Sequence, residues 1–426
     1  MTDKPEPTKS RQEVLDDALF NMTGTGNIEA VRELVKKGGN PAKQINGRHN
    51  CLRLAIQRAY FHLVRYFVEE CGLKLSDDPK VFHYAALGNI KHPSMLAYLQ
   101  ENGGDVNGED EKLGTPLTLG LFTSDTGAVD ETFVRWLLQH GAEPAHQLTG
   151  GERTTALHKA IEAGSYDLVQ TLLRCEGVPA LLDAKDINGR TPLHVAAEAG
   201  RADVVELLLT DFKANPNQMV HYTPLFLAVQ NGHSDVAKLL VDAGADVDIK
   251  DDTHECSPLH LAASNNLLTI IDLLCKNQAT VDVPDKRGFT PLLMAATENY
   301  FEAVKLLVKH GANPSFRGPG GATALHVIAG RNQARMAALL LQLGADPDAK
   351  DEDGVSPATG VEGNQRLMNV FANYKQVFEE GKTCSFCFTL IDGQKRCARC
   401  KSAYYCSVEH QKEDWKEHKL NCKPKK

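Results

Sequence analysis

The chain has 426 residues, of which 42% are hydrophobic and 24% are charged, and its formal net charge is −8. This composition is typical of a globular protein, and no apolar run approaches the roughly 18 residues that a membrane-spanning helix needs. The first dozen residues contain Pro, Lys and Glu without an apolar core, so they do not predict a secretory signal. We therefore expect a soluble protein of the cytoplasm or the nucleus, with residues 1–10 disordered.

The cysteines and the charges are unevenly distributed along the chain. Six of the eleven cysteines lie between Cys384 and Cys422. Because no export signal is recognised, this dense cluster predicts metal-binding thiolates rather than disulfides. Residues 384–426 carry a formal charge of +5 and the rest of the chain carries −13. The other five cysteines are predicted to be buried thiols: Cys51, Cys71, Cys175, Cys256 and Cys275.

A tetrapeptide of the type Thr-Pro-Leu-His recurs in the middle of the chain. Its copies begin at Thr155, Thr191, Thr223, Ser257, Thr290 and Thr323, with spacings of 36, 32, 34, 33 and 33 residues. A period near 33 indicates stacked repeats, because one such unit cannot bury its apolar face alone. Weaker copies begin at Asn50, Lys80, Thr115 and Ser356, and residues 13–40 look like a capping repeat. The pattern predicts about eleven units over residues 11–373.

The residues of one unit, 186–209, predict a turn followed by two helices. Gly189 permits the positive φ of a tight turn, Thr191 can cap the first helix, and Pro192 occupies the first helical turn, where its missing N–H costs nothing. Gly200 ends that helix, and residues 204–209 supply the apolar face of a second helix. The unit resembles the ankyrin repeat, which implies a mostly α-helical solenoid.

The histidines of the recurring motif are His158, His194, His260 and His326. A residue that returns at the same place in every unit serves the geometry of the unit, so we predict a hydrogen bond to the neighbouring loop rather than catalysis or metal binding. Cys175 and Cys275, near the ends of second helices, are predicted to be inert packing thiols.

The predicted binding surface of the array is formed by turn tips and first helices. An insertion at residues 122–130, between the two helices of its unit, is either a functional loop or a tolerated one. Asn107 resembles ankyrin asparagines that become hydroxylated, and stabilisation of its turn is the alternative. The residues expected to project from the binding surface are Asn188, Arg190, Tyr222, His254, Lys286 and Arg287.

The C-terminal segment contains the pattern CSFC-x9-CARC-x5-CSVEH-x7-H-x3-C. Closed sites of four Cys and His ligands are the sites that structural zinc prefers, so eight ligands predict two Zn²⁺ ions. A reduced cysteine-rich tail without metal is the alternative. The eight candidate ligands are Cys384, Cys387, Cys397, Cys400, Cys406, His410, His418 and Cys422.

Helix geometry restricts which of these ligands share an ion. Residues 407–420 contain no Gly or Pro and are predicted to be helical. Twelve helical residues span about 18 Å, so Cys406 and His410 cannot easily join Cys422 on one ion. A helix that breaks early would restore sequential pairing. The crossed pairing that follows from an unbroken helix puts Cys384, Cys387, Cys406 and His410 at zinc 1 and Cys397, Cys400, His418 and Cys422 at zinc 2.

The spacings, with the YYC motif ending at Cys406 and QKEDWKEHK starting at Gln411, resemble a MYND zinc finger over residues 384–422. The resemblance also implies crossed pairing, although His410 stands where the family usually has Cys. It implies in addition a groove for a proline-containing peptide, lined by Gln411 and Trp415, with Tyr405 as a third candidate. Trp415 could instead fill the core of this small module, and Tyr405 could serve in packing.

These features predict a non-enzymatic adaptor, in which the array binds one protein and the finger binds another across a linker at residues 374–383. No SET-like segment, phosphate loop or nucleophile constellation is found, and we expect no small-molecule substrate and no membrane insertion. Nucleic-acid binding would rest only on the basic tail at residues 423–426 and a modest basic excess. The alternatives are an accessory subunit of a methyltransferase or ubiquitin-ligase complex and a trafficking factor for signalling proteins.

Overall fold

The computed structural model describes most of the array and two short segments beyond it. The described ranges are 10–45, 49–88, 92–110, 112–121, 131–144, 154–175, 178–359, 361, 364–372, 395–396 and 404–405. The predicted disordered N-terminus, the insertion at 122–130, the linker and the eight zinc ligands lie outside them, apart from Ser10. The chain forms two compact units, Met1–Ala214 (unit 1) and Asn215–Lys426 (unit 2).

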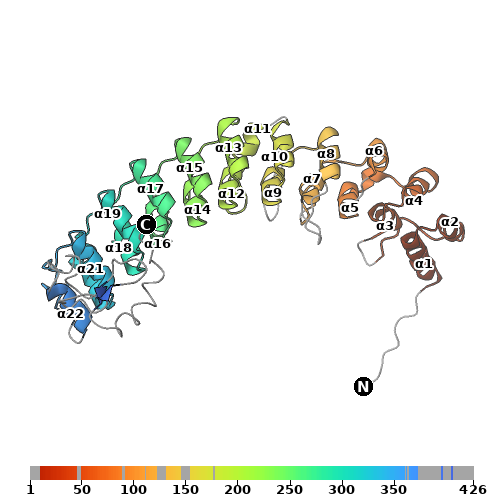
Figure 1. Cartoon of the computed structure of the whole chain (residues 1–426). Coiled ribbons are helices and arrows are strands. Elements are labelled where there is room, and N and C mark those ends of the chain that lie inside the picture. Colours follow the sequence, from red (N-terminus) through yellow and green to blue (C-terminus); the bar gives the residue numbers. More distant parts are fainter. Residues whose placement is uncertain are drawn as a thin grey trace, which may run out of the picture. The chain divides into compact units, whose positions relative to one another are not determined.

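Unit 1 consists of helix pairs joined by turns (Figure 1). Helix α4 continues into one turn of π-helix, η1, and a 3₁₀ turn, η2, follows. The helices are α1 (Arg11–Thr25), α2 (Ile28–Lys36), α3 (Cys51–Gln57), α4 (Phe61–Arg65), η1 (Tyr66–Glu70), η2 (Leu75–Asp77), α5 (Val81–Leu87), α6 (Pro93–Glu101), α7 (Pro116–Gly120), α8 (Glu131–Gln139), α9 (Ala156–Glu162), α10 (Tyr166–Leu173), α11 (Val178–Leu182), α12 (Pro192–Glu198) and α13 (Ala202–Thr210).

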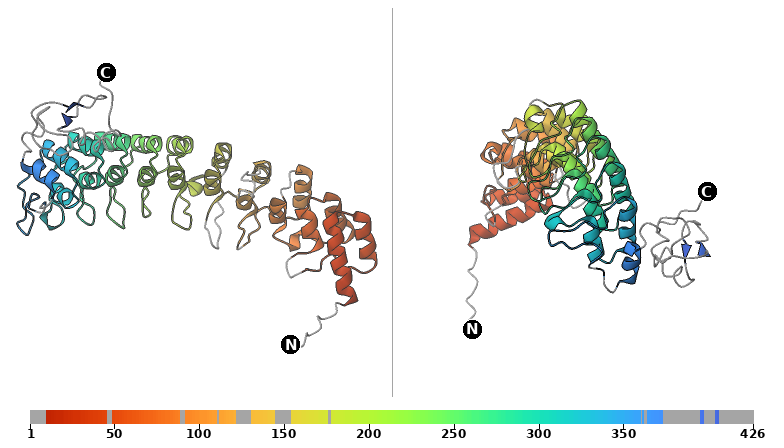
Figure 2. Two further views of the ribbon diagram at one scale, coloured as in Figure 1. Left: turned by 60° about the horizontal axis from the view of Figure 1, so that its bottom comes forward. Right: turned by 90° about the vertical axis from the view of Figure 1, so that its left-hand side faces the viewer.

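Unit 2 continues the same arrangement, and Figure 2 shows the pairs of each unit from two further sides. A two-residue antiparallel ladder, β1 with β2, lies beyond the last helix. No helix among the described residues is long and apolar enough to cross a bilayer. The elements are α14 (Pro224–Gln230), α15 (Ser234–Asp242), α16 (Pro258–Ser264), α17 (Leu268–Lys276), α18 (Pro291–Thr297), α19 (Phe301–Lys309), η3 (Pro319–Gly321), α20 (Ala324–Gly330), α21 (Ala334–Gln342), α22 (Gln365–Ala372), β1 (Lys395–Arg396) and β2 (Tyr404–Tyr405).

The predicted local structure of one unit is confirmed. Gly189 has a φ of 77° in the turn, Thr191 is the N-cap of α12, and Pro192 is its first residue. The second helix, α13, buries Val204 and Val205 completely. Burial of this kind in each second helix supplies the apolar stabilisation that holds neighbouring units together.

Two units depart from the regular pattern of one turn and two helices. The 36-residue spacing between Thr155 and Thr191 accommodates the additional helix α11, whose Leu181 is fully buried. In the last unit, residues 357–359 form a turn in place of a first helix, and α22 closes the described array. The array therefore ends on a shortened unit.

Glycine allows two backbone segments of unit 1 to approach each other closely. A Cβ atom on Gly88 would lie 2.2 Å from the carbonyl oxygen of Gln57, and one on Gly108 would lie 2.0 Å from that of Pro79. No side chain fits at either distance, so glycine is required where neighbouring repeats come into main-chain contact.

Candidate protein-interaction face

The first helix of a typical unit is capped by a threonine and a histidine acting together. The Thr155 hydroxyl lies 2.8 Å from Nδ1 of His158, and the Thr155 N–H also points to that nitrogen at 3.4 Å. Thr191 and His194 repeat the arrangement at the start of α12, with 2.7 Å between hydroxyl and Nδ1. The histidine thus acts as an acceptor on this side and satisfies N-terminal donors of its own helix.

The other ring nitrogen of the histidine reaches the following unit. Because a carbonyl oxygen only accepts, Nε2 carries the proton and donates. The bonds run from His83 to Gly114 O (2.7 Å), from His158 to Arg190 O (2.9 Å), from His260 to Phe289 O (2.9 Å) and from His326 to Val355 O (3.0 Å). This link to a neighbouring loop was predicted for His158, His194, His260 and His326. The structure confirms it for His158, His260 and His326.

His83 shows the consequence of a missing hydroxyl. Its unit has Lys80 where the units of His158, His194, His260 and His326 have Thr or Ser, and Nδ1 of the fully buried His83 has no hydrogen-bond partner among the described residues. Lys80 instead forms an ion pair with Asp110 in the next turn. Charge pairing between repeats has replaced helix capping at this position.

The buried histidines should make the array less stable in mild acid. Burial lowers the pKa of His83, His158 and His260 below the ordinary 6.5. Between pH 6.5 and the lower pKa values of the folded state, the unfolded chain binds more protons than the folded one. The contribution of the neutral histidines to the free energy of unfolding is therefore complete above about pH 6.5 and is lost as the pH falls below that value. We expect the urea midpoint, followed by far-UV circular dichroism, to drop between about pH 7.5 and pH 5.

The chain itself suggests the control for this prediction. Leu293 occupies the histidine position in the unit of α18, so His158→Leu introduces a side chain that the repeat tolerates. The variant should be less stable at neutral pH and should lose part of the pH dependence. A midpoint of the native protein that stays constant across this range would contradict the prediction.

The turn before α12 is built around a buried carboxylate. Asp186 accepts hydrogen bonds from the N–H groups of Asn188 (2.9 Å) and Arg190 (2.8 Å), and its side chain is 1% exposed. The Arg190 Nε atom donates to the same carboxylate at 2.8 Å. The ion pair with Arg190 and the main-chain hydrogen bonds to Asp186 together stabilise the turn.

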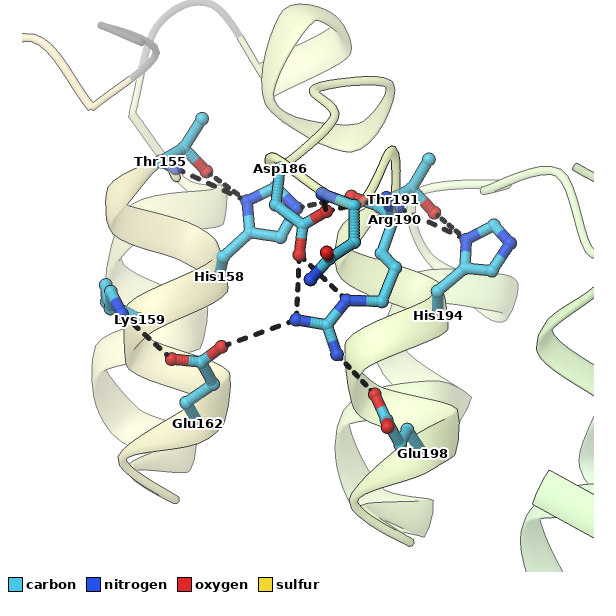
Figure 3. A network of polar contacts seen from close by, with 10 residues as sticks. Thr155, His158, Lys159, Glu162, Asp186, Arg190, Thr191, His194 and Glu198 are labelled. Atoms are coloured by element: carbon cyan, nitrogen blue, oxygen red, sulfur yellow. Dashed lines mark hydrogen bonds and ion pairs between the residues drawn. The ribbon is translucent and has the colours of Figure 1, made fainter. Parts of the chain in front are cut away.

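Arg190 extends this turn into a network that connects α9 with α12 (Figure 3). Its guanidinium contacts Glu198 of α12 and lies 3.9 Å from Glu162 of α9, whose second oxygen lies 3.2 Å from Lys159 Nζ. Only 25% of the Arg190 side chain is exposed. The prediction that Arg190 projects as a free contact is therefore wrong, because its charge is used within the fold.

The remaining predicted contact residues differ in their accessibility. Asn188, His254, Lys286 and Arg287 are exposed. Tyr222 is half-buried and stacks on Phe226, with 4.9 Å between ring centroids. The turn tips are thus accessible, as predicted, except where an aromatic or ionic partner holds the side chain.

Sequence analysis missed a second set of accessible residues on the first helices. The residue four positions after the capping Thr or Ser is half-buried in α16, α18 and α20. The motif period was available as a signal, because these residues return at one position of the recurring unit. They are Leu261, Met294 and Val327.

Of the five scattered cysteines that were predicted to be buried, Cys51 and Cys256 are buried and Cys71, Cys175 and Cys275 are only half-buried. Cys175 and Cys275 are half-buried, and burial raises the pKa of both, that of Cys275 to about 11. Thiolate, the reactive form, is therefore scarce at neutral pH. The prediction of inert thiols agrees with this environment.

Asn107 connects two neighbouring loops of unit 1. Its side-chain nitrogen donates to Gly141 O at 2.9 Å, and its side-chain oxygen accepts the N–H of Glu143 at 2.9 Å. The structure therefore gives Asn107 a stabilising role between loops, and its hydroxylation stays a prediction.

The predicted zinc ligands, with Gln411 and Trp415, lie outside the described residues. Tyr405 belongs to β2, where it pairs with Lys395 of β1. Among the described residues no group of three or more His, Cys, Asp or Glu could hold a metal ion. The Cys and His donors of residues 384–422 are themselves the ligand types that Zn²⁺ prefers, so the donor set fits the metal.

Comparison with known proteins identifies both parts of the chain. Family models match at residues 82–183, 124–220, 175–251, 213–285 and 259–351 for ankyrin repeats (3 copies) and at 384–422 for the MYND finger. The ankyrin repeat domain of Bcl-3, described as a unique member of the IkappaB protein family, aligns with 51% of this chain and 98% of that chain at 27% identity and a TM-score of 0.47.

The similar curated proteins are methyltransferases that share the finger. N-lysine methyltransferase SMYD2 of Homo sapiens is 52% identical over 54 residues, 13% of this chain and 12% of that protein. SMYD2 of Gallus gallus is 54% identical over 46 residues, 11% of either chain. These matches are confined to the MYND region, so the chain spans about an eighth of the length of the curated relatives it matches. Because the ankyrin models together match residues 82–351, more than half of the chain, the protein belongs to the ankyrin-repeat family and carries a C-terminal MYND zinc finger.

Proposed function

We propose that the protein is a non-enzymatic adaptor whose ankyrin array binds one protein and whose MYND finger binds a proline-containing peptide of another. The observation that carries this proposal is the pairing of two interaction modules, an array over residues 82–351 and a finger over 384–422. The array supports it further, because accessible turn residues such as Lys286 and Arg287 accompany rigid helices. A common chain would raise the effective concentration of one partner near the other.

In the finger, zinc would be held by the eight Cys and His residues, as two ions in the crossed pairing. Bound zinc supplies folding free energy to a module too small for a large apolar core. Gln411 and Trp415, four residues apart on the predicted helix, would then present an amide beside an indole face. A proline-rich segment is already extended, so it could stack a ring on the indole at low entropic cost.

Trp415→Ala tests the peptide site. The variant should lose roughly 2 kcal/mol of binding free energy for a proline-containing peptide, about 30-fold in Kd, because a central aromatic anchor is removed. Fluorescence anisotropy with the full chain would measure this, with zinc content as the control for folding. Normal binding by the variant would refute the groove, and loss of zinc would assign Trp415 to the core.

Deletions separate the contributions of the two modules. We expect the array to supply most of the affinity for its partner, because its surface is far larger than that of some forty finger residues. Affinity purification with the full chain should recover the partners of both modules. Purification with a chain that lacks residues 384–426 should recover the partners of the array and lose those of the finger. Complete retention of all partners by residues 374–426 alone would contradict this division.

A second candidate is an accessory role in a lysine-methyltransferase complex. It is suggested by the 52% identity to the finger of N-lysine methyltransferase SMYD2, which implies that the two fingers bind peptides of one class. Competition between the two proteins for one proline-containing peptide would support it, and distinct peptide preferences would remove it.

A further inference from the structure

Three neighbouring first helices of unit 2 present an apolar side chain at the same position. Leu261 of α16, Met294 of α18 and Val327 of α20 each follow the capping residue by four positions, and each is half-buried. Helix α18 packs against both α16 and α20. The three side chains therefore form one partly exposed line, here called the apolar row.

The residues beside the apolar row leave room for a main chain. The Ser264 hydroxyl donates to Leu261 O at 3.1 Å, and the Thr297 hydroxyl donates to Met294 O at 2.8 Å, so both are folded back onto their own helices. At the corresponding position of α20, a Cβ atom on Gly330 would meet nothing within 4 Å. A ligand could approach these helices closely along this side.

The same positions in two neighbouring first helices of unit 1, α9 and α12, are occupied differently. Helix α9 has Lys159 and Glu162 there, and these two side chains pair with each other at 3.2 Å. Helix α12 has Glu198 at the second of these positions, and its carboxylate contacts Arg190. At these positions α9 and α12 thus carry charges that are paired within the fold, whereas α16, α18 and α20 carry no charge there.

Positive charge accompanies the apolar row in the turns that lead into α18 and α20. Lys286, Arg287 and Arg317 are exposed. The Lys286 ammonium lies 3.5 Å from Thr253 O, and within the described ranges no carboxylate pairs with Lys286 or Arg317. The guanidinium of Arg287, 68% exposed, lies 5.0 Å from the centroid of the Phe289 ring, just before α18 begins.

The turns on either side carry negative charge, which confines the positive charge to the middle of the row. Glu255 is exposed before α16, and Glu352 and Asp353 are exposed after α20. A ligand lying along the row would therefore meet cations at its centre. An acidic ligand complements this pattern, and a basic one opposes it.

The spacing of the helices specifies the ligand further. Packed helices lie about 8–10 Å apart, and a chain in the polyproline II conformation advances about 3.1 Å per residue with three residues per turn, so that every third side chain points to the same face. One ligand side chain for each helix therefore requires an apolar residue at about every third position. We infer that the apolar row of unit 2 binds an extended segment of a partner protein in which apolar residues recur at every third position with Asp or Glu between them.

This inference rests on the proposed adaptor function and names the surface and the ligand of its array. The probe is a fluorescent peptide of about ten residues with Leu at every third position and Glu between. Matched peptides carry Lys in place of Glu, or Leu at every second position. We expect the full chain to bind the first peptide more tightly than the other two in anisotropy titrations at low salt.

Two variants and two controls test the site. Met294→Glu should weaken binding about tenfold, because a charge is placed in the centre of the row. The double variant Lys286→Glu with Arg287→Glu should weaken binding of the Glu peptide and strengthen that of the Lys peptide. Leu268→Glu on α17, where the side chain is 37% exposed, and Lys309→Glu on α19 make the same chemical changes on second helices and should have no effect.

Equal binding of the Glu and Lys peptides, failure of the Glu peptide to bind, or insensitivity to Met294→Glu would overturn the inference. Its failure is distinguishable from failure of the adaptor function. An array partner captured equally by the native chain and by Met294→Glu would remove this surface and leave the adaptor standing. The absence of any partner for residues 1–373 would remove both.

Discussion

Replacing Arg190 by Ala should destabilise the array by about 3 kcal/mol, because the change leaves a buried carboxylate without its cation. Asp186, 1% exposed, would keep two main-chain N–H donors and lose the guanidinium at 2.8 Å. Glu162 and Glu198 would then face that carboxylate without a positive charge between them. The urea midpoint of unfolding should fall clearly, as measured by far-UV circular dichroism at neutral pH.

The turn before α18 offers the matched control. Asp285 is as buried as Asp186 and also pairs with an arginine, Arg287, but that arginine is 68% exposed. Water can replace an exposed guanidinium more easily than a buried one, so Arg287→Ala should lower the midpoint by clearly less than Arg190→Ala does. Arg190→Lys should fall between native protein and Arg190→Ala, since it keeps the charge without the planar fork. Equal effects of the two Ala variants would show that the burial of Arg190 and its contacts with Glu162 and Glu198 add no stability.

The protein purified without chelator should contain two zinc ions per chain, because eight Cys and His donors have suitable spacing. Pairs of substitutions distinguish the crossed from the sequential arrangement. Cys397→Ser with Cys422→Ser should leave one ion in the crossed arrangement and none in the sequential one. Cys406→Ser with Cys422→Ser should give the reverse result. Elemental analysis of the three samples, the native chain and the two double variants, would distinguish the two pairings, and fewer than two ions in the native chain would contradict the proposal.

Removal of zinc should unfold the finger and spare the array. Folding of a small zinc module depends on its metal, whereas each repeat is stabilised by its neighbours. Among the described residues no cluster could hold a metal ion, so the array has no comparable dependence there. A chelator should therefore leave the helical signal of the array unchanged. Loss of that signal on chelation would show that the two parts fold as one.

The start of each helix could be predicted from the sequence because it depends on neighbouring residues. Thr191, Pro192 and His194 act within one helical turn, and the recurring motif predicts the same role for the equivalent residues of other units. The role of Arg190 could not be predicted in this way. Glu162 is distant in the sequence, and its approach to Arg190 arises only when α9 and α12 pack together.

The motif period places the three residues of the apolar row at one position of the unit, but it does not indicate that they are exposed. In short helices such as α16, α18 and α20, nearly every position is apolar, and periodicity does not separate a buried Leu259 from a half-buried Leu261. Only the positions of the neighbouring helices decide which apolar side chain meets solvent. The assignment of ligands to zinc ions likewise depends on how distant Cys and His residues approach, and it stays a prediction.

The direction of the histidine links has a consequence for synthesis on the ribosome. Each link runs from one repeat to a main-chain carbonyl of the following repeat, as from His260 to Phe289 and from His326 to Val355. Since the chain emerges from its N-terminus, the Nε2 donor of such a histidine must wait for the next repeat to provide its carbonyl and can bond only to water until then. The last unit avoids this wait, because Thr359 stands at the histidine position and its hydroxyl lies 2.9 Å from that of Ser356 in its own turn. The polar side chain at this position of the last unit is therefore satisfied within its own turn, without a carbonyl from a further repeat.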